Sequence, residues 1–293
     1  MKRQMNPNTL KLHDMGQGLW LDNITRDLLD SGTLAHYIAK LSVTGLTSNP
    51  TIFEQAIGSG ASYDAIVQAL TARGLSEEGI YFELALQDLT RAAELFRPVF
   101  DASEGVDGWV SLEVSPLLAA DTAGTIHAAA QLHARAARPK LFIAVAMRCN
   151  RVHRELLDSA RWRKLAAAGA RPQRLLWTST STKDPAARDT LYLEALAAPE
   201  TINTIPEKTL LAFADHGQPG ATLPADGGLA DTVLEESRRE GVDDEALAAQ
   251  LQRDGVLAFA KSWGGLLARI REKSQGSATA TATASAALAG HPQ

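Results

Sequence analysis

Ser42-Val-Thr-Gly-Leu-Thr-Ser-Asn-Pro50 is the stretch that decides the fold of this chain. Its apolar first half predicts a buried strand over 42–47, and its polar end predicts a turn into a helix that starts near Thr51. The same alternation precedes it, since a predicted strand over 18–22 is followed by a predicted helix over 26–40. Repeated strand–helix units place parallel strands between helices, so the pattern predicts an α/β fold with a parallel sheet.

The rest of the chain continues this alternation. Further helices are predicted over 78–96, 119–137 and 151–168, and further strands over 108–114, 141–147, 174–179 and 201–205. These elements are expected to form one domain over 1–275. Residues 276–293 are rich in Ala, Thr and Ser and carry too little bulky apolar surface to offset their ordering entropy, so they are predicted to be a disordered, low-complexity tail.

Composition and charge argue against several classes of protein. The chain has 293 residues, of which 45% are hydrophobic, so it can bury a large core. Its net charge of -5 offers no basic surplus for a nucleic-acid backbone. The longest apolar run, 141–147, covers about a third of the ~20 residues that a membrane-spanning helix needs. We therefore expect a soluble protein with neither nucleic acid nor membrane as a partner.

Cysteine and histidine usage also limits the chemistry. Cys149 is the only cysteine, so an internal disulfide or a cysteine metal cluster cannot form, which suits a reducing cytoplasm. The seven histidines are scattered, and no pair has convincing metal spacing. We expect a cytoplasmic protein without a metal site.

Sequence motifs at the predicted strand ends carry a family resemblance. They are Trp20-Leu-Asp22, Thr44-Gly-Leu-Thr-Ser-Asn-Pro50, Val110-Ser-Leu-Glu-Val114, Arg174-Leu-Leu-Trp-Thr-Ser-Thr-Ser-Thr-Lys-Asp-Pro185 and Asn203-Thr-Ile-Pro-Glu-Lys-Thr209. Together they resemble the transaldolase signatures. The resemblance covers residues 10–143 and 150–273, which is most of the chain.

The resemblance implies both a fold and a reaction. The fold is a (β/α)8 TIM barrel. The reaction, which belongs to the pentose phosphate pathway, moves a dihydroxyacetone unit from sedoheptulose 7-phosphate to glyceraldehyde 3-phosphate, giving erythrose 4-phosphate and fructose 6-phosphate. It proceeds through a lysine Schiff base without a cofactor, so sugar phosphates are the expected partners. By resemblance, Asp22 and Glu113 are catalytic carboxylates, and Thr47, Asn49 and Ser179 bind substrate.

Asp22, Asn49 and Glu113 also have simpler interpretations. An Asp after a strand is commonly a helix cap, and Asn-Pro is an ordinary turn. Glu113 lies inside a predicted strand, where it could face solvent at a sheet edge. The sequence alone leaves these alternatives open.

The sequence departs from the family where the nucleophile should lie. The family pattern is Leu-Phe-Ile-Lys, whereas Leu141-Phe-Ile143 is followed here by Ala144. The chain then resembles a much later family segment. A barrel uses ~30 residues for each βα unit, so two units cannot fit between residues 147 and 174. Strands five and six are therefore predicted to be missing, and the barrel to be incomplete.

The missing lysine leaves the activity open. Lys183 follows a predicted strand and is the remaining candidate for a substitute nucleophile, while Lys208 is more simply a solvated charge at a helix start. One hypothesis is a transaldolase that has recovered a lysine. The alternative is a catalytically inactive transaldolase-like remnant, and aldolase-type cleavage would need the same lysine. The sequence does not determine the oligomeric state.

Overall fold

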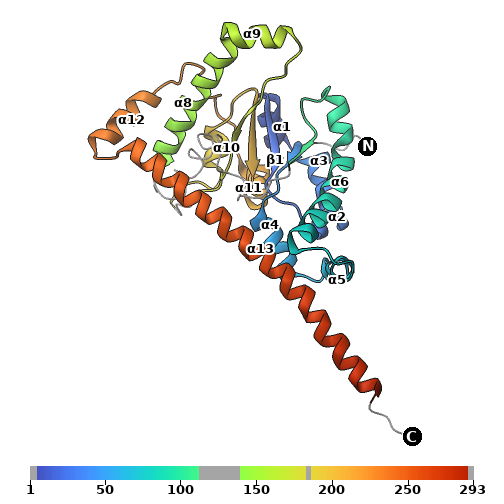
Figure 1. Ribbon diagram of the computed structural model, residues 1–293. Helices are drawn as coiled ribbons and strands as arrows, with labels where there is room; N and C mark the ends of the chain where they lie inside the picture. The colour runs from blue at the N-terminus through green and yellow to red at the C-terminus, as the bar shows by residue number, and fades with distance from the viewer. Residues whose placement is uncertain (1–4, 112–138, 183–185, 290–293) are drawn as a thin grey trace.

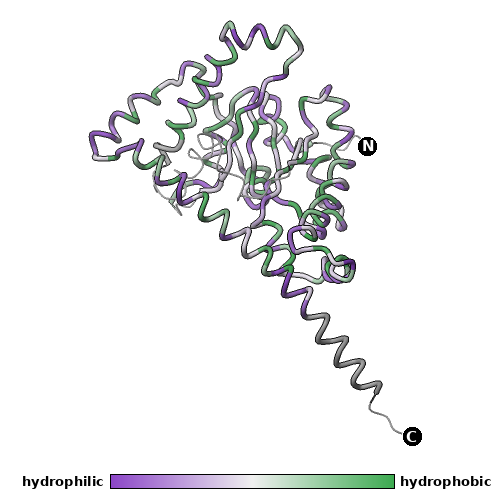
Figure 2. Tube along the Cα trace, viewed as in Figure 1, coloured by the Kyte–Doolittle hydropathy of each residue, from purple (hydrophilic) through white to green (hydrophobic). Residues whose placement is uncertain are grey.

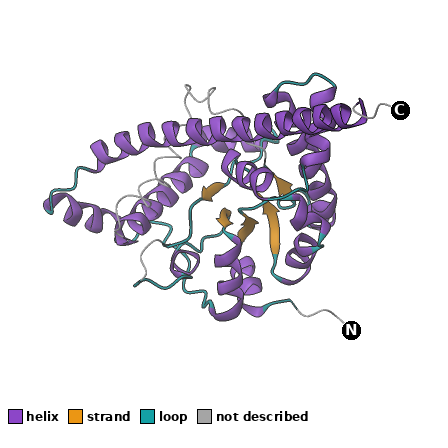
Figure 3. Ribbon diagram, turned by 90° about the horizontal axis from the view of Figure 1, so that it is seen from below, coloured by secondary structure: helices purple, strands orange, loops and turns teal. Residues whose placement is uncertain are grey.

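The computed structural model describes residues 5–111, 139–182 and 186–289 (Figure 1). At its centre is a sheet of five parallel strands, which are β1 (Gln17–Leu21), β2 (Val43–Leu46), β3 (Trp109–Val110), β4 (Leu175–Trp177) and β5 (Thr201–Ile205). The sheet curls into a half-barrel with helices around its outside (Figure 3). The predicted α/β class and parallel sheet are confirmed.

The strand order is β3-β2-β1-β5-β4. The first strand of the chain therefore lies between the second and the last, with Leu19 paired to Asn203 and Leu21 paired to Ile205. First and last strands lie side by side when a repeated βα chain curls back on itself, as in a TIM barrel. Strands β3 and β4 form the two edges of the described sheet.

The helices of the described residues lie around the sheet (Figure 3). They are α1 (Pro7–Asp14), α2 (Arg26–Asp30), α3 (Thr33–Lys40), α4 (Pro50–Ser59), α5 (Asp64–Ala72), α6 (Glu77–Ala102), α8 (Pro139–Asp158), α9 (Ala160–Ala167), α10 (Leu191–Ala195), α11 (Glu207–His216), α12 (Ala230–Arg239) and α13 (Asp244–Ala289). The main core packs Leu19 and Leu21 of β1 against helix residues such as Leu34, Phe53 and Phe96. Figure 2 shows hydrophilic residues concentrated on α12, away from the strands.

An ion pair joins the amino ends of the two edge strands. Arg174, just before β4, donates from Nη1 to Asp107 Oδ1 at 2.9 Å and from Nη2 to Val106 O at 2.7 Å, both just before β3. A Cβ added to Gly18 of β1 would lie 3.2 Å from Arg174 Nη1 and 3.3 Å from Asp107 Oδ1. The pair therefore lies directly over β1 and links both edges of the curled sheet.

Helix α13 links the two sides of the molecule at the opposite end. It starts beside α12, where Arg238 Nη2 donates to Asp244 Oδ2 at 2.7 Å, and then passes along α4 (Figures 1 and 3). Thr51 Oγ1 donates to Ser262 Oγ at 2.9 Å. Trp263 packs edge-on against Tyr81 of α6 with ring centroids 5.1 Å apart. These contacts hold α13 across the carboxyl side of β2.

Most of the predicted elements are confirmed. The strands predicted over 18–22, 42–47, 174–179 and 201–205 correspond to β1, β2, β4 and β5, and the helix predicted over 78–96 lies within α6. The helix predicted over 26–40 is two helices, α2 and α3, interrupted at Ser31 and Gly32. The helix predicted over 151–168 also breaks, because Ser159 Oγ accepts from Trp162 N and starts α9.

The strand predicted over 141–147 is wrong, because this segment lies inside α8. A short apolar run reads equally well as a strand or as a buried helix turn. Here Ala146 packs with Trp177 of β4, whereas Ala144 packs with Leu234 of α12. Apolar neighbours on both sides of α8 explain why the run lacks the polar positions of a surface helix.

Four other predictions are not decided by the described residues. The helix predicted over 119–137 and the strand beyond residue 111 lie outside them. The domain bounds 1–275 and the disorder of 276–293 in solution stay predictions, although α13 is helical to Ala289. Within the described ranges, no helix combines the length and apolar character needed to cross a membrane.

Candidate functional site

The candidate site lies where the parallel strands end. Asp22 directly follows β1, and Thr47 directly follows β2. Loops at the carboxyl ends of barrel strands converge on one face. Thr47 Oγ1 donates to Asp22 Oδ1 at 3.0 Å, so the structure brings these two predicted residues together.

The surroundings of Asp22 shift its protonation. Burial raises the pKa of the Asp22 carboxyl, and the hydrogen bond from Thr47 opposes this rise without cancelling it. None of the described lysine or arginine side chains contributes to this pKa. A carboxyl with a raised pKa that accepts a hydrogen bond from a hydroxyl is suited to take up and return a proton.

Asn49 lies in the next turn and caps a helix. Its Oδ1 accepts a 2.9 Å hydrogen bond from Ile52 N, while Pro50 occupies the first helical position of α4. The sequence offered an ordinary turn as the simpler interpretation of Asn49-Pro50, and the structure shows that the Asn49 side-chain oxygen serves as a helix cap. A side-chain amide also carries two N–H donors, which the cap does not use. Asn49 is half-buried, so these donors can serve a ligand at the carboxyl end of β2.

Ser179 lies after β4 in a less common backbone conformation. Its φ is 55°, and its side chain is exposed. The next residue is anchored, because Thr180 Oγ1 donates to Thr204 O at 3.0 Å. Among the contacts of the described residues, none joins Ser179 to Asp22. Non-glycine residues with positive φ cluster at ligand-binding turns, which keeps Ser179 as a candidate.

The other predicted positions divide into two groups. Glu113 and Lys183 lie outside the described residues. Ala144 is buried in α8 with 2% of its surface exposed, so the position expected for the nucleophile is on a helix against α12. Lys208 is exposed on α11. Within the described ranges, no group of three or more His, Cys, Asp or Glu side chains could hold a metal ion.

Comparison with known proteins identifies the family. The family model described as transaldolase/fructose-6-phosphate aldolase matches residues 19–158 and 149–270. The chain belongs to this family. The resemblance predicted from the motifs is confirmed.

Curated relatives carry the same family name. The chain is 34% identical to a transaldolase of Parafrankia sp. over 352 aligned positions, which cover 88% of this chain and 95% of the relative. It is 34% identical to a transaldolase of Thermobifida fusca, with 90% and 97% covered. A transaldolase of Thiobacillus denitrificans is 33% identical, with 87% and 97% covered. The transaldolase-family match includes all the predicted site positions, from Asp22 to Lys183.

Sequence reasoning missed a second group beside Asp22. Asn23 Nδ2 donates to Glu207 Oε2 at 3.1 Å, and the Tyr37 hydroxyl donates to Glu207 Oε1 at 2.7 Å. The sequence contained one signal for it, since Asn23 follows Asp22 and Glu207 lies in a quoted transaldolase motif. The pairing itself spans 184 positions of sequence and could not be predicted from local pattern.

Proposed function

We propose that this chain is a transaldolase that transfers a dihydroxyacetone unit from sedoheptulose 7-phosphate to glyceraldehyde 3-phosphate. The observation that carries the proposal is the half-buried Asp22 carboxyl, hydrogen-bonded by Thr47 at the carboxyl end of a curled parallel sheet in a chain of the transaldolase family. The names of the relatives support the same activity.

The chemistry assigns a role to each group. A lysine amine adds to the ketose carbonyl, and the carbinolamine loses water to give an iminium. Asp22 takes the proton of the hydroxyl next to the breaking C–C bond, and the iminium accepts the electron pair while erythrose 4-phosphate leaves. The bound three-carbon carbanion then attacks the aldehyde of glyceraldehyde 3-phosphate, and water releases fructose 6-phosphate. Glu113 assists with protons, and Thr47, Asn49 and Ser179 bind substrate.

The proposal also names the lysine that forms the Schiff base. Ala144 cannot supply an amine, so we assign the Schiff base to Lys183, which follows β4 in sequence. Barrel enzymes carry their catalytic loops in the segments that follow their strands. Lys208 also follows a strand, but it is exposed on α11 and serves as the matched comparison.

We also propose that the chain is a shortened barrel that lacks strands five and six of the family, in which β1 is the first strand and β5 the last. The adjacency of β1 and β5 supports this, since the first and last strands of a closed barrel are neighbours. The two overlapping family matches, 19–158 and 149–270, support an internal gap. So does the Parafrankia alignment, because 88% of 293 residues is about 258, which leaves about 94 of the 352 aligned positions without a residue of this chain.

Borohydride trapping tests the proposed function directly. The purified chain is incubated with sedoheptulose 7-phosphate, the iminium is reduced to a stable secondary amine, and peptides are analysed by mass spectrometry. Formation of erythrose 4-phosphate is measured in parallel. We expect an adduct on Lys183, with turnover lost in Lys183→Ala and retained in Lys208→Ala. An adduct on another lysine would refute the assignment of Lys183 but not the activity.

One observation favours a second candidate, a catalytically inactive remnant. Ala144 of α8 is buried against Leu234 of α12. The position expected to carry the lysine is therefore neither on a strand nor open to substrate. Folded protein that gives neither adduct nor turnover would favour this candidate. Either a covalent adduct or turnover would exclude it.

A further inference from the structure

The side chain of Glu207 joins three elements at the carboxyl end of the sheet. Glu207 is the first residue of α11 and follows the end of β5 after one proline. Its Oε1 accepts from the Tyr37 hydroxyl of α3 at 2.7 Å, and its Oε2 accepts from Asn23 Nδ2 at 3.1 Å. Asn23 directly follows Asp22. One oxygen of the Glu207 carboxylate thus binds the turn that carries Asp22. The other oxygen binds Tyr37 of α3, which fixes the position of Glu207.

We propose that Glu207 is a positioning residue of the candidate site, which fixes the turn carrying Asp22 through Asn23 while Tyr37 fixes Glu207. This rests on the proposed function, in which Asp22 moves protons. Glu207 itself contacts Asn23 and has no assigned role in the chemistry.

The backbone alone fixes only part of this turn. Asp22 N donates to Ile205 O at 2.9 Å, which continues the pairing of β1 with β5 by one residue. The next anchor along the turn is Arg26 N, which donates to the Tyr63 hydroxyl at 2.9 Å. Between these two points, Ile24 packs into the main core, and the bond from Asn23 to Glu207 ties the turn to α11. It is a hydrogen bond to a charged acceptor, which is the stronger kind.

A glutamate at the start of a helix has a simpler role, because its charge favours the helix N-terminus. That role needs no side-chain partners. Glu207 is half-buried and accepts from two side chains, one of them from a tyrosine that is 6% exposed. Burial, together with the neighbouring Glu207 carboxylate, raises the pKa of Tyr37 to about 12, so its hydroxyl remains a donor at neutral pH. The Glu207 carboxylate is therefore fixed by hydrogen bonds to protein side chains rather than surrounded by solvent.

Titration of the Asp22 carboxyl by carbon NMR tests the proposal without substrate. The signal is assigned by its loss in Asp22→Asn. Asn23→Ala removes the tether and keeps the charge of Glu207, whereas Glu207→Gln removes the charge and keeps the shape. We expect Asn23→Ala to lower the pKa of Asp22 toward its ordinary range, because a loosened turn lets water reach the carboxyl.

Asn8→Ala is the matched control. Asn8 Nδ2 donates to Phe213 O at 3.3 Å and to Ala214 O at 3.2 Å, so this variant also removes asparagine hydrogen bonds to α11, but at the far end of the helix. We expect it to leave the pKa of Asp22 unchanged. Equal shifts in Asn8→Ala and Asn23→Ala would mean that α11 packing alone matters, which would overturn the proposal.

Two further outcomes are decisive. If the pKa of Asp22 shifted in Glu207→Gln but not in Asn23→Ala, Glu207 would act on Asp22 by charge alone, which would refute positioning. An unchanged pKa of Asp22 in both variants would also refute it. Tyr37→Phe provides a second route if Asn23→Ala does not fold, with the same expected fall in the pKa of Asp22. Since the titration uses no sugar phosphate, it gives its answer whether or not the chain turns over substrate.

Discussion

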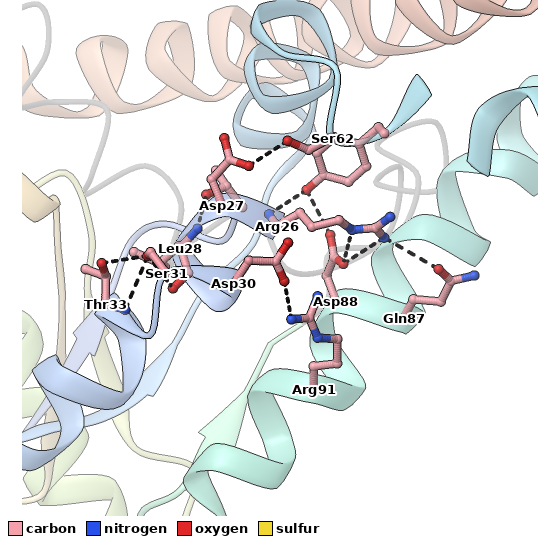
Figure 4. A network of polar contacts seen from close by, with 12 residues as sticks. Arg26, Asp27, Leu28, Asp30, Ser31, Thr33, Ser62, Gln87, Asp88 and Arg91 are labelled. Carbon is pink, nitrogen blue, oxygen red and sulfur yellow. Dashed lines mark hydrogen bonds and ion pairs between the residues drawn. The ribbon is translucent and has the colours of Figure 1, made fainter. Parts of the chain in front are cut away.

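Removal of Asp88 should cost more stability than removal of any exposed acid, because its carboxylate is the centre of a buried network (Figure 4). Asp88 is 0% exposed and Arg26 is 8% exposed. Asp88 Oδ1 accepts from Arg26 Nε at 3.0 Å and from Arg26 Nη2 at 2.9 Å, and Oδ2 accepts from the Tyr63 hydroxyl at 2.8 Å. The guanidinium carbon of Arg26 lies 4.7 Å from the Tyr63 ring centroid.

The magnitude follows from what Asp88→Ala leaves behind. Breaking a buried ion pair by removing one partner costs about 3–5 kcal/mol, because the other charge remains desolvated. The Tyr63 hydroxyl also loses its acceptor. Domains of this kind are stable by about 5–15 kcal/mol, so the substitution should remove about a fifth or more of the free energy of unfolding. Urea denaturation followed by tryptophan fluorescence measures this loss.

Asp101→Ala is the matched control for this prediction. Asp101 accepts from Arg97 at 2.8 Å, a distance like those at Asp88, but the two side chains are 57% and 72% exposed. Exposed ion pairs contribute at most about 1 kcal/mol. If Asp88→Ala and Asp101→Ala shifted the denaturation midpoint equally, burial would not be what makes the Asp88 network matter, and the reasoning would be refuted.

Three further predictions concern the strands and their amino ends. Gly45→Ala should lower the free energy of unfolding by about 1–3 kcal/mol, measured by urea denaturation, because the added Cβ would lie 2.6 Å from the Trp20 indole; an unchanged midpoint would contradict the close packing. Arg174→Gln should speed amide hydrogen exchange in β3 and β4 more than in β1, because it breaks the 2.9 Å pair with Asp107 that links the two edges; uniform exchange would argue against that link. The Asp107 carboxylate raises the pKa of His13, so the stability gained from the charged imidazole is present at low pH and is lost as pH rises through the raised pKa. His13→Gln should reduce this loss in thermal melts between mildly acidic and mildly alkaline pH, and an unaltered pH dependence would exclude His13 as its source.

The contacts between the segments before β3 and β4 matter because these two strands are the edges of the described sheet. In a complete barrel each strand has two neighbours, and the closed hydrogen-bond ladder sets the curvature. Here β3 and β4 each have one described neighbour. The ion pair over Gly18 and the hydrogen bond from Arg171 Nη1 to Gly105 O connect the two sides of the half-barrel at the amino ends of the strands. Helix α13 connects them at the other end.

Local sequence was sufficient to predict an element where the residues at its two ends mark its boundaries. The strand at 201–205 is bounded by Pro199 and Pro206, and its β-branched residues favour extended backbone, so prediction and structure agree. Asn49 and Pro50 likewise start α4 by a cap and a fixed φ. The motif around Asp22 and Thr47 gave the family, and the structure adds the 3.0 Å bond between them.

Tertiary structure decided what local pattern leaves open. The run at 141–147 is apolar without a clear period, so its helical form depends on being packed between β4 and α12, which lie far away in sequence. The tie from Asn23 to Glu207 depends on β1 and β5 being neighbours. The sequence by itself determined the strand–helix alternation, the family and the candidate carboxylates, because each of these depends on short contiguous segments. Only the folded chain determined which distant residues meet, because burial and hydrogen bonding between elements are properties of their packing.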